Sequence, residues 1–334
     1  MPKLLFIGPK FYNYHETIKS GFEKAGFTVD YFDDRPDDKF ITKALIRINK
    51  KLISKKITKY FNEILEKTKD IQYDVIFVLY GQSFNKKMME QLKQQHINSR
   101  FIFYMYDPLV SSPDRIEFID IFDDFYSFDY DDCKKNNGLK LVPLFYSFKD
   151  FPKKEKIYDA CFISTMMPGK YKKSSEIIHE LEKNNYKIFK YSYIQSKLVY
   201  IYFKLKSTDF KGSKLKEFTF KRMSSDEMKS IISSSNIIID CPKKGQSGLT
   251  IRTFEALAAN KKLITTNKTI INYDFYRPEN IYVFDKFIDF TNIFFNSDFI
   301  PIEKKVKDNY SIDAWIRKIL SNYKRGNNIW KELY

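Results

Sequence analysis

The segment from Asn236 to Thr266 constrains the fold of this chain more than any other. It begins with an isoleucine-rich run that ends at Asp240 and continues through a glycine-containing loop, Gln246 to Thr250. An Ala- and Leu-rich helical pattern follows, and a second apolar run from Lys262 ends the segment. A strand, a glycine loop and a helix start are how an α/β domain presents backbone N–H groups to a phosphate. The sequence therefore predicts an α/β fold with an anion-binding loop here.

The same alternation begins at the first residues of the chain. An apolar strand from Lys3 ends at Gly8, a helix is expected over residues 15–25, and a second strand over residues 27–32. This order is a βαβ unit, which is typical of a parallel sheet. Further strands are expected at 74–80, 101–106, 124–128, 139–144, 158–163 and 186–191, and helices at 85–95, 174–184, 226–234 and 311–320.

The length of 334 residues and a restart after a polar stretch near residue 150 predict two domains. We expect two Rossmann-like domains that face a cleft, formed by residues 1–150 and 151–310. Residues 311–334 are expected to form a C-terminal helix and tail that pack back on the N-terminal domain. Ligands of such folds bind at the carboxyl ends of the strands.

The composition favours a globular cytosolic protein. Apolar residues make up 43% of the chain, and no apolar run approaches the roughly 18–20 residues that span a bilayer. The three cysteines, Cys133, Cys161 and Cys241, are isolated and lack metal-ligand spacing, which indicates a reducing compartment. The sequence Asp129-Tyr130-Asp131 matches the D-x-D pattern of metal-dependent transferases. Its flanks fit an ordinary strand exit, so no metal is assigned.

The net charge of +16 predicts an acidic partner: nucleic acid, an anionic membrane or a phosphorylated ligand. From Lys39 to Lys59, apolar residues recur at helical spacing between lysines. Such a basic amphipathic helix suits the headgroup layer of a membrane. An ordinary surface helix that faces its own core has the same pattern, and both readings stay open. The basic and aromatic stretch from Tyr191 to Arg222 has no recognisable nucleic-acid module around it, so we expect no nucleic-acid partner.

One motif carries a resemblance to a known family. The run from Gly248 to Ala258 (GLTIRTFEALA) is similar to the G-x-x-x-R-x-F-E-A-L-A element of GT-B glycosyltransferases, particularly the CgeB-like and capsule or lipopolysaccharide biosynthesis branch. The resemblance implies that Glu255 binds the ribose of a nucleotide-diphosphate sugar. It also implies that the preceding loop holds the diphosphate, through Gln246, Ser247, Gly248, Leu249 and Thr250.

The chemistry of these residues agrees with that role, with one departure. A carboxylate can accept both hydroxyls of a ribose, and cations near a helix start meet diphosphate charge. Arg252 lies at the helix start, and Lys170 and Lys173 follow the first strand of the second domain. A local ion pair is the alternative for Arg252 and Glu255. Many retaining relatives have a second Glu at the position of Ser247, so the retaining mechanism is not carried over.

An inverting transfer needs a base that deprotonates the acceptor hydroxyl. His15 follows the loop of the first strand and begins a helix, and a histidine suits this work near neutral pH. Asp107, at the carboxyl end of a strand, is the second candidate. Each residue also has a structural alternative. His15 could simply stand next to the N-cap of its helix, and Asp107 could cap the turn at Pro108.

These observations favour a glycosyltransferase that moves a sugar from a nucleotide-diphosphate donor to a glycan or lipid-linked acceptor, without a metal or other cofactor. The expected location is the cytoplasm, with the inner face of the membrane as the place where the basic helix would act. A non-catalytic nucleotide- or glycan-binding protein of the same fold and a basic nucleic-acid-binding protein are the alternatives.

Overall fold

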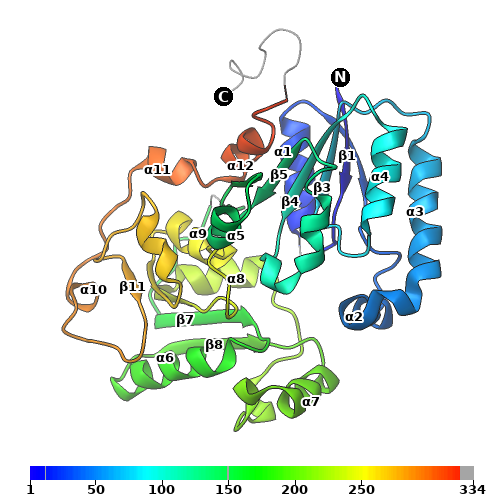
Figure 1. Cartoon of the computed structure of the whole chain (residues 1–334). Coiled ribbons are helices and arrows are strands. Elements are labelled where there is room, and N and C mark those ends of the chain that lie inside the picture. Colours follow the sequence, from blue (N-terminus) through cyan, green and yellow to red (C-terminus); the bar gives the residue numbers. More distant parts are fainter. Residues whose placement is uncertain (12, 149, 324–334) are drawn as a thin grey trace. The chain divides into compact units, whose positions relative to one another are not determined.

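The computed structural model describes residues 1–11, 13–148 and 150–323, so residues 324–334 of the expected C-terminal tail lie outside the described part. The chain forms two compact units (Figure 1). Unit 1 contains Met1–Pro143 together with the chain from Ile312 onward, and unit 2 contains Leu144–Ser311. Unit 2 is therefore an insertion in the sequence of unit 1.

Unit 1 is built on a six-stranded parallel sheet with the order β2-β1-β3-β4-β5-β6. Its strands are β1 (Lys3–Ile7), β2 (Thr28–Phe32), β3 (Val75–Leu79), β4 (Arg100–Met105), β5 (Asp124–Ser127) and β6 (Leu139–Leu141). Its helices are α1 (Tyr14–Lys24), α2 (Phe40–Asn49), α3 (Ser54–Thr68), α4 (Lys86–Gln95), α5 (Tyr130–Lys135) and α12 (Ile312–Ile319).

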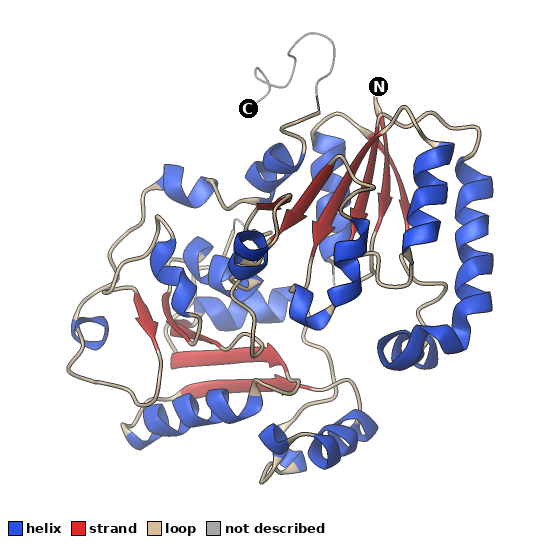
Figure 2. Ribbon diagram, viewed as in Figure 1, coloured by secondary structure: helices blue, strands red, loops and turns tan. Residues whose placement is uncertain are grey.

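The central strands of unit 1 are buried on both faces, as the continuous apolar run of β3 (VIFVL) predicts for a parallel sheet. Alternate residues point to opposite faces, so Ile76 and Val78 join the core formed with α3 and α4. Phe77 faces the other way, where its ring meets Phe22 of α1 and Trp315 of α12. Helices therefore cover both faces of the sheet (Figure 2).

Helix α12 completes unit 1 by packing against α1. Trp315 is buried and makes edge contacts with the rings of Phe77 and Tyr104. The two helices approach closely because residue 21 is glycine: a Cβ there would lie 2.9 Å from Cγ1 of Ile316.

Unit 2 has a five-stranded parallel sheet with the order β11-β10-β9-β7-β8. Its strands are β7 (Tyr158–Thr165), β8 (Ile188–Tyr193), β9 (Ser235–Asp240), β10 (Lys262–Thr265) and β11 (Ile281–Val283). Its helices are α6 (Tyr171–Lys183), α7 (Lys197–Lys206), α8 (Ser225–Ser233), α9 (Ile251–Ala258), α10 (Ile293–Asn296) and α11 (Lys304–Asp308). Of the two serines that could cap this helix from the sequence, Ser224 and Ser225, it is Ser224 that caps α8, through a capping box with Glu227.

The basic stretch from Lys39 to Lys59 is not one helix, which corrects the expectation. Asn49 has an extended backbone and its side chain accepts the N–H of Lys51 at 3.1 Å, so a 3₁₀ turn (Lys50–Ile53) separates α2 from α3. Ile46 and Ile57 are buried in the core of unit 1, while Leu52 is exposed. Ile53 also packs against this core, whereas Ile41 is 70% exposed, and the side chains of Phe40 and Ile48 lie outside the description. The segment therefore has apolar side chains both in its own core and exposed to solvent.

Candidate functional site

The glycine loop and helix α9 lie at the carboxyl edge of the unit 2 sheet. Strand β7 is the first strand of this sheet, and the chain adds β8 on one side of it and β9 on the other. The order of strands thus reverses between β7 and β9, which is where open α/β sheets bind ligands. The loops after these two strands approach closely. Gly169 has a φ of +92°, and a Cβ there would lie 3.2 Å from the backbone nitrogen of Lys244.

The glycine loop is held in one orientation by side chains from beyond strand β10. The Asn267 amide donates to the carbonyls of Ser247 (3.0 Å) and Gly248 (3.1 Å), and Thr269 Oγ1 donates to that of Ser247 (2.5 Å). In a trans peptide the C=O and the next N–H point in opposite directions. The N–H groups of Gly248 and Leu249 are therefore turned away from Asn267. The Gln246 amide also donates to the Gly248 carbonyl at 2.9 Å, so this predicted contact residue shapes the loop.

The two helix starts at this edge differ in how their N–H groups are used. At α6, the Asp209 carboxylate accepts from the backbone N–H groups of Gly169 (2.9 Å), Tyr171 (3.0 Å) and Lys172 (3.0 Å). A carboxylate of the chain itself thus occupies the anion position of α6. At α9, the side chain of the N-cap residue Thr250 makes no capping hydrogen bond to the helix, and its hydroxyl donates to Asp240 instead. The start of α6 is thus filled by Asp209, which leaves the start of α9 as the position to consider for an external anion.

Charged side chains of both signs meet beneath the α9 loop. Asp240, the last residue of β9, is buried and accepts from the hydroxyls of Thr250 (2.7 Å) and Thr253 (3.2 Å). Burial raises the pKa of Asp240, and the nearby Lys170 ammonium opposes this rise. Lys170 is half-buried with its Nζ 3.4 Å from Ser164 Oγ, and burial lowers its pKa. A positive charge thus stands beside the α9 loop, supported by a buried carboxylate.

Arg252 and Glu255 form an ion pair with each other, in which the guanidinium donates to Oε2 of the carboxylate. This was the structural alternative for the two residues. Only 1% of the Glu255 side chain is exposed, burial raises its pKa, and its Oε1 has no hydrogen-bond partner among the described residues. Binding a ribose through Glu255 would therefore require the buried Oε1 to become accessible.

Lys173, the second predicted lysine, has other partners. Its ammonium pairs with Glu176 at 2.9 Å, donates to the carbonyl of Asp285 at 3.2 Å and lies over the Phe284 ring at 5.5 Å from the centroid. The structure thus brings Lys170 to the α9 loop and holds Lys173 near the end of β11.

The two predicted bases lie at the carboxyl edge of the unit 1 sheet. The His15 ring lies against Tyr31, with ring centroids 5.4 Å apart, and Tyr31 donates to the carbonyl of Gly8 at 2.7 Å. Asp107 follows β4 and acts electrostatically on Tyr80, whose pKa is raised by burial and by this carboxylate. Tyr80 has a φ of 67°, which is rare for a bulky residue and is typical of functional sites.

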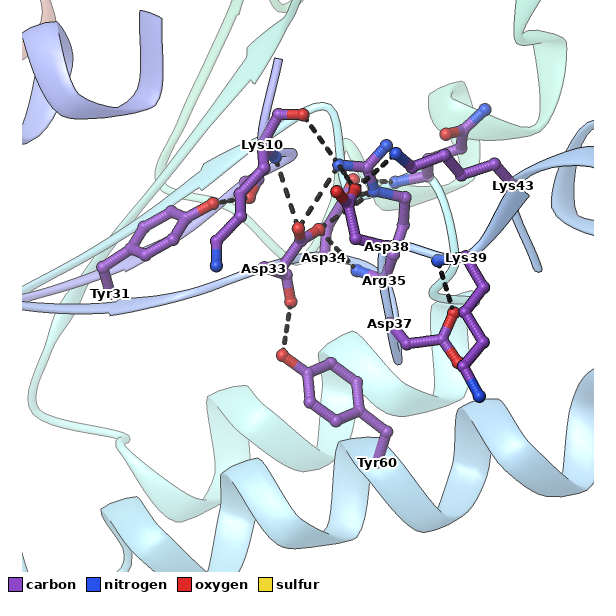
Figure 3. A network of polar contacts seen from close by, with 12 residues as sticks. Lys10, Tyr31, Asp33, Asp34, Arg35, Asp37, Asp38, Lys39, Lys43 and Tyr60 are labelled. Carbon is purple, nitrogen blue, oxygen red and sulfur yellow. Dashed lines mark hydrogen bonds and ion pairs between the residues drawn. The ribbon is translucent and has the colours of Figure 1, made fainter. Parts of the chain in front are cut away.

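A second charged cluster at this edge was not found from the sequence (Figure 3). Arg35 donates to both carboxylate oxygens of Asp33, at 3.0 and 3.3 Å, and its Nε lies 3.7 Å from Oδ1 of Asp34. Asp34 is completely buried, and its Oδ2 accepts the backbone N–H of Gln82 at 2.7 Å. Three consecutive charged residues after a strand were the only available signal, and that pattern is common on surfaces.

The D-x-D sequence has a structural role at its first residue. Asp129 is buried and caps α5, where its Oδ1 accepts the N–H of Asp132 at 3.2 Å. This agrees with the reading of the segment as an ordinary strand exit.

Comparisons with known proteins identify the fold. No family model and no curated protein sequence matches the chain. Among solved structures, a glycosyltransferase from Rickettsia africae matches with a TM-score of 0.54 at 13% identity, covering 97% of this chain and 98% of that one. Anabaena HepE in complex with UDP and glucose matches with 0.53 at 9% identity, covering 97% and 96%. UDP-GlcNAc 2-epimerase from Methanocaldococcus jannaschii matches with 0.51 at 11% identity, covering 96% and 100%. The expected two-domain α/β fold of the GT-B type is confirmed.

Proposed function

We propose that this protein is a glycosyltransferase that uses a nucleotide-diphosphate sugar and releases the nucleotide diphosphate. One observation carries the proposal: the glycine loop is oriented by Asn267 and leads into α9 beside the Lys170 ammonium, where the strand order reverses. Such a position stabilises the negative charge of a diphosphate. The bond between the sugar and the diphosphate breaks more readily when the negative charge that develops on the leaving diphosphate is stabilised in this way.

The solved structures support the donor class. HepE, which has the same fold, was solved with UDP and glucose, and the epimerase is named for a UDP-sugar. The epimerase also shows that this fold serves an enzyme that is not named for transfer to an acceptor, so donor binding and transfer need separate tests.

Finer features belong to the same proposal. We assign the chain to the CgeB-like or capsule and lipopolysaccharide branch, on the motif at Gly248 to Ala258, with a glycan or lipid-linked acceptor. Transfer proceeds without a metal, because Lys170 and Arg252 meet the diphosphate charge; chelation of divalent ions with EDTA is expected to leave turnover unchanged. Three cysteines present as thiols support a cytoplasmic location.

The substitution Asn267→Asp tests the donor loop. It replaces the amide that donates to two loop carbonyls by a carboxylate that repels them, so the loop should lose its orientation. We expect the affinity for UDP, GDP or ADP, whichever binds in calorimetric titration, to fall about tenfold or more. Asn272→Asp makes the same chemical change at an exposed position and should leave the affinity unchanged.

Glu255→Ala is a poor first test of the site. Removing one partner of a buried ion pair costs about 3–5 kcal/mol, so a loss of binding would mix a folding defect with a lost contact. No nucleotide binding by the folded wild-type protein, or equal affinity in both Asn variants, would contradict the proposed donor site. Tight DNA binding that weakens steeply with salt would favour the nucleic-acid alternative instead.

We propose that His15 is the base that deprotonates the acceptor hydroxyl, with Asp107 as the second candidate for this role. His15→Asn is expected to lower kcat about a hundredfold or more, because general-base assistance is worth roughly 10²–10⁴ in rate. Asp107→Asn is expected to lower kcat by less. Nucleotide affinity should be unchanged in both, because neither residue belongs to unit 2. Nucleotide-sugar turnover that needs no acceptor would indicate an epimerase or hydrolase instead.

A further inference from the structure

Helix α7 of unit 2 has apolar side chains on two faces, and only one face packs against the core. Tyr200 is buried, and Val199 and Phe203 pack against the core of unit 2. The other face is exposed to solvent: its apolar side chains have exposed fractions of 71% for Leu198, 50% for Ile201, 54% for Tyr202 and 78% for Leu205. These four positions follow the spacing i, i+3, i+4, i+7, so they form one stripe along the helix.

Hydrogen bonds hold helix α7, and with it this stripe, to the rest of unit 2. Ser196 caps the helix by accepting the N–H of Val199 at 3.3 Å. The Tyr200 hydroxyl and the Lys204 ammonium both donate to the carbonyl of Ser213, at 3.0 and 2.9 Å. Asp209, just after the helix, joins the segment to the start of α6 through its three backbone hydrogen bonds. Helix α7 projects from the rest of unit 2 as a fixed element (Figure 1).

The chain around the stripe is strongly basic. Exposed lysines lie on the helix and in the turns that follow it: Lys197, Lys206, Lys211, Lys214, Lys216 and Lys221. Residues 196–222 contain the acids Asp209 and Glu217, and both are engaged. Asp209 holds α6, and Glu217 accepts from the backbone N–H of Lys214 and from the hydroxyl of Tyr171. The stripe therefore has a positive border.

We propose that α7 docks on an anionic membrane, with Leu198, Ile201, Tyr202 and Leu205 in the headgroup and acyl boundary and the lysines on lipid phosphates. A helix with exposed apolar side chains and lysines beside them is the kind that binds such a surface. The charge excludes a second copy of this chain as the preferred partner, because each copy would bring the same positive border to the contact. This inference does not rest on the proposed sugar transfer.

Helix α7 differs from the basic stretch of Lys39 to Lys59 in how its apolar side chains are buried. That stretch places Ile46 and Ile57 in the core of unit 1, whereas the outer stripe of α7 has no such burial. No described helix is long and apolar enough to cross a bilayer. Helix α7 has 10 residues, about half the length that crosses a bilayer, so it can lie on a membrane surface but not span it.

Sedimentation of the full chain with lipid vesicles tests the proposal. The wild-type protein should bind vesicles of phosphatidylcholine with about one-third phosphatidylglycerol, and should bind less to phosphatidylcholine alone or at high salt. The double variant Leu198→Glu/Leu205→Glu should lower the partition coefficient about tenfold or more, because it places two charges on the inserted face.

A matched control separates the stripe from a general charge effect. Ile271→Glu/Phe287→Glu adds the same two charges at apolar residues of unit 2 that are 56% and 69% exposed and lie outside α7. This variant should keep most of the binding. Circular dichroism and nucleotide titration should be unchanged in both variants, so a membrane failure would be distinct from a failure of the donor site.

Three results would overturn the proposal. They are no wild-type binding to anionic vesicles, equal losses in the two double variants, and a change from oligomer to monomer in Leu198→Glu/Leu205→Glu without lipid. The last result would identify the stripe as a contact between copies of the chain. A blue shift of the fluorescence of Leu205→Trp on anionic vesicles, absent with neutral ones, would support insertion directly.

Discussion

Asp34 shows how a single side chain in unit 1 links burial to pH. Its carboxyl is completely buried beside Asp33, and both the burial and that neighbouring charge raise its pKa. The hydrogen bond from the Gln82 N–H and the Arg35 guanidinium oppose this rise. The folded state therefore binds the proton of Asp34 more tightly than the unfolded state does.

Asp34→Asn should consequently change the pH profile of stability. An acid whose folded pKa is raised stabilises the fold fully below its unfolded pKa of about 4, and this contribution is lost as the pH rises toward neutrality. Asparagine keeps an acceptor for the Gln82 N–H and does not titrate. We expect the difference in unfolding free energy between variant and wild type to move by about 1–2 kcal/mol in favour of the variant between pH 4 and 7.5. Urea unfolding at several pH values measures it.

Asp70→Asn is the control for this profile, because Asp70 is exposed. Its profile should follow that of the wild type. A profile for Asp34→Asn that runs parallel to the wild type would show that Asp34 keeps an ordinary pKa in the folded protein.

Two of the residues that sequence reasoning missed, Asn267 and Asp209, lie far along the chain from the groups that they hold. Arg252 and Glu255 lie within one helix, so their spacing is visible in the sequence. Asn267 lies 20 residues from the Ser247 carbonyl that it holds, and Asp209 lies 40 residues from Gly169. Nothing local distinguishes an asparagine that orients a loop, or an aspartate that fills a helix start, from an ordinary turn residue.

At the scale of elements, the contact between α1 and α12 depends on a single missing methyl group. Glycine within a helix costs about 0.5–1 kcal/mol relative to alanine, yet Gly21 lies in the middle of α1. The close approach of Ile316 explains this, because a Cβ at position 21 would meet its Cγ1 at 2.9 Å.

The sign of Gly21→Ala should depend on residue 316. In the wild-type background the added methyl group must displace α12, and we expect the substitution to destabilise the protein by about 1–3 kcal/mol. In an Ile316→Ala background the obstacle is gone, so the same substitution should stabilise by about 1 kcal/mol through helix propensity. A double-mutant cycle by thermal or urea unfolding measures both. Equal effects in the two backgrounds would show that the methyl group does not meet Ile316.

Helices and strands also differ in how readily they can be predicted from the sequence. The apolar run of β3 predicts a strand directly, and the serines before α8 predict a helix start to within one residue. Helix α7 was not predicted: its residues (KLVYIYFKLK) are apolar on opposite faces and rich in aromatic and β-branched residues, so no single stripe stands out. The serine at its N-cap, Ser196, was the one available signal.

At the scale of the whole molecule, alternating strands and helices were enough to predict parallel sheets, because most strands are followed by a helix before the next strand. Which unit α12 belongs to depends on packing between segments that are distant in the sequence: Trp315 contacts the rings of Phe77 in β3 and Tyr104 in β4. From the sequence we expect this helix to pack on the N-terminal domain, but no pattern within residues 311–320 indicates that position.

The insertion of unit 2 within unit 1 has a consequence for synthesis on the ribosome. All six strands of the first sheet emerge before Pro143, but the helix that covers Phe77 and Tyr104 begins at Ile312. The nascent first unit therefore waits, with an apolar face open, while 168 residues from Leu144 to Ser311 are translated. At about 5–20 residues per second this lasts roughly ten seconds or more, during which the second unit can fold first and a chaperone can cover the open face.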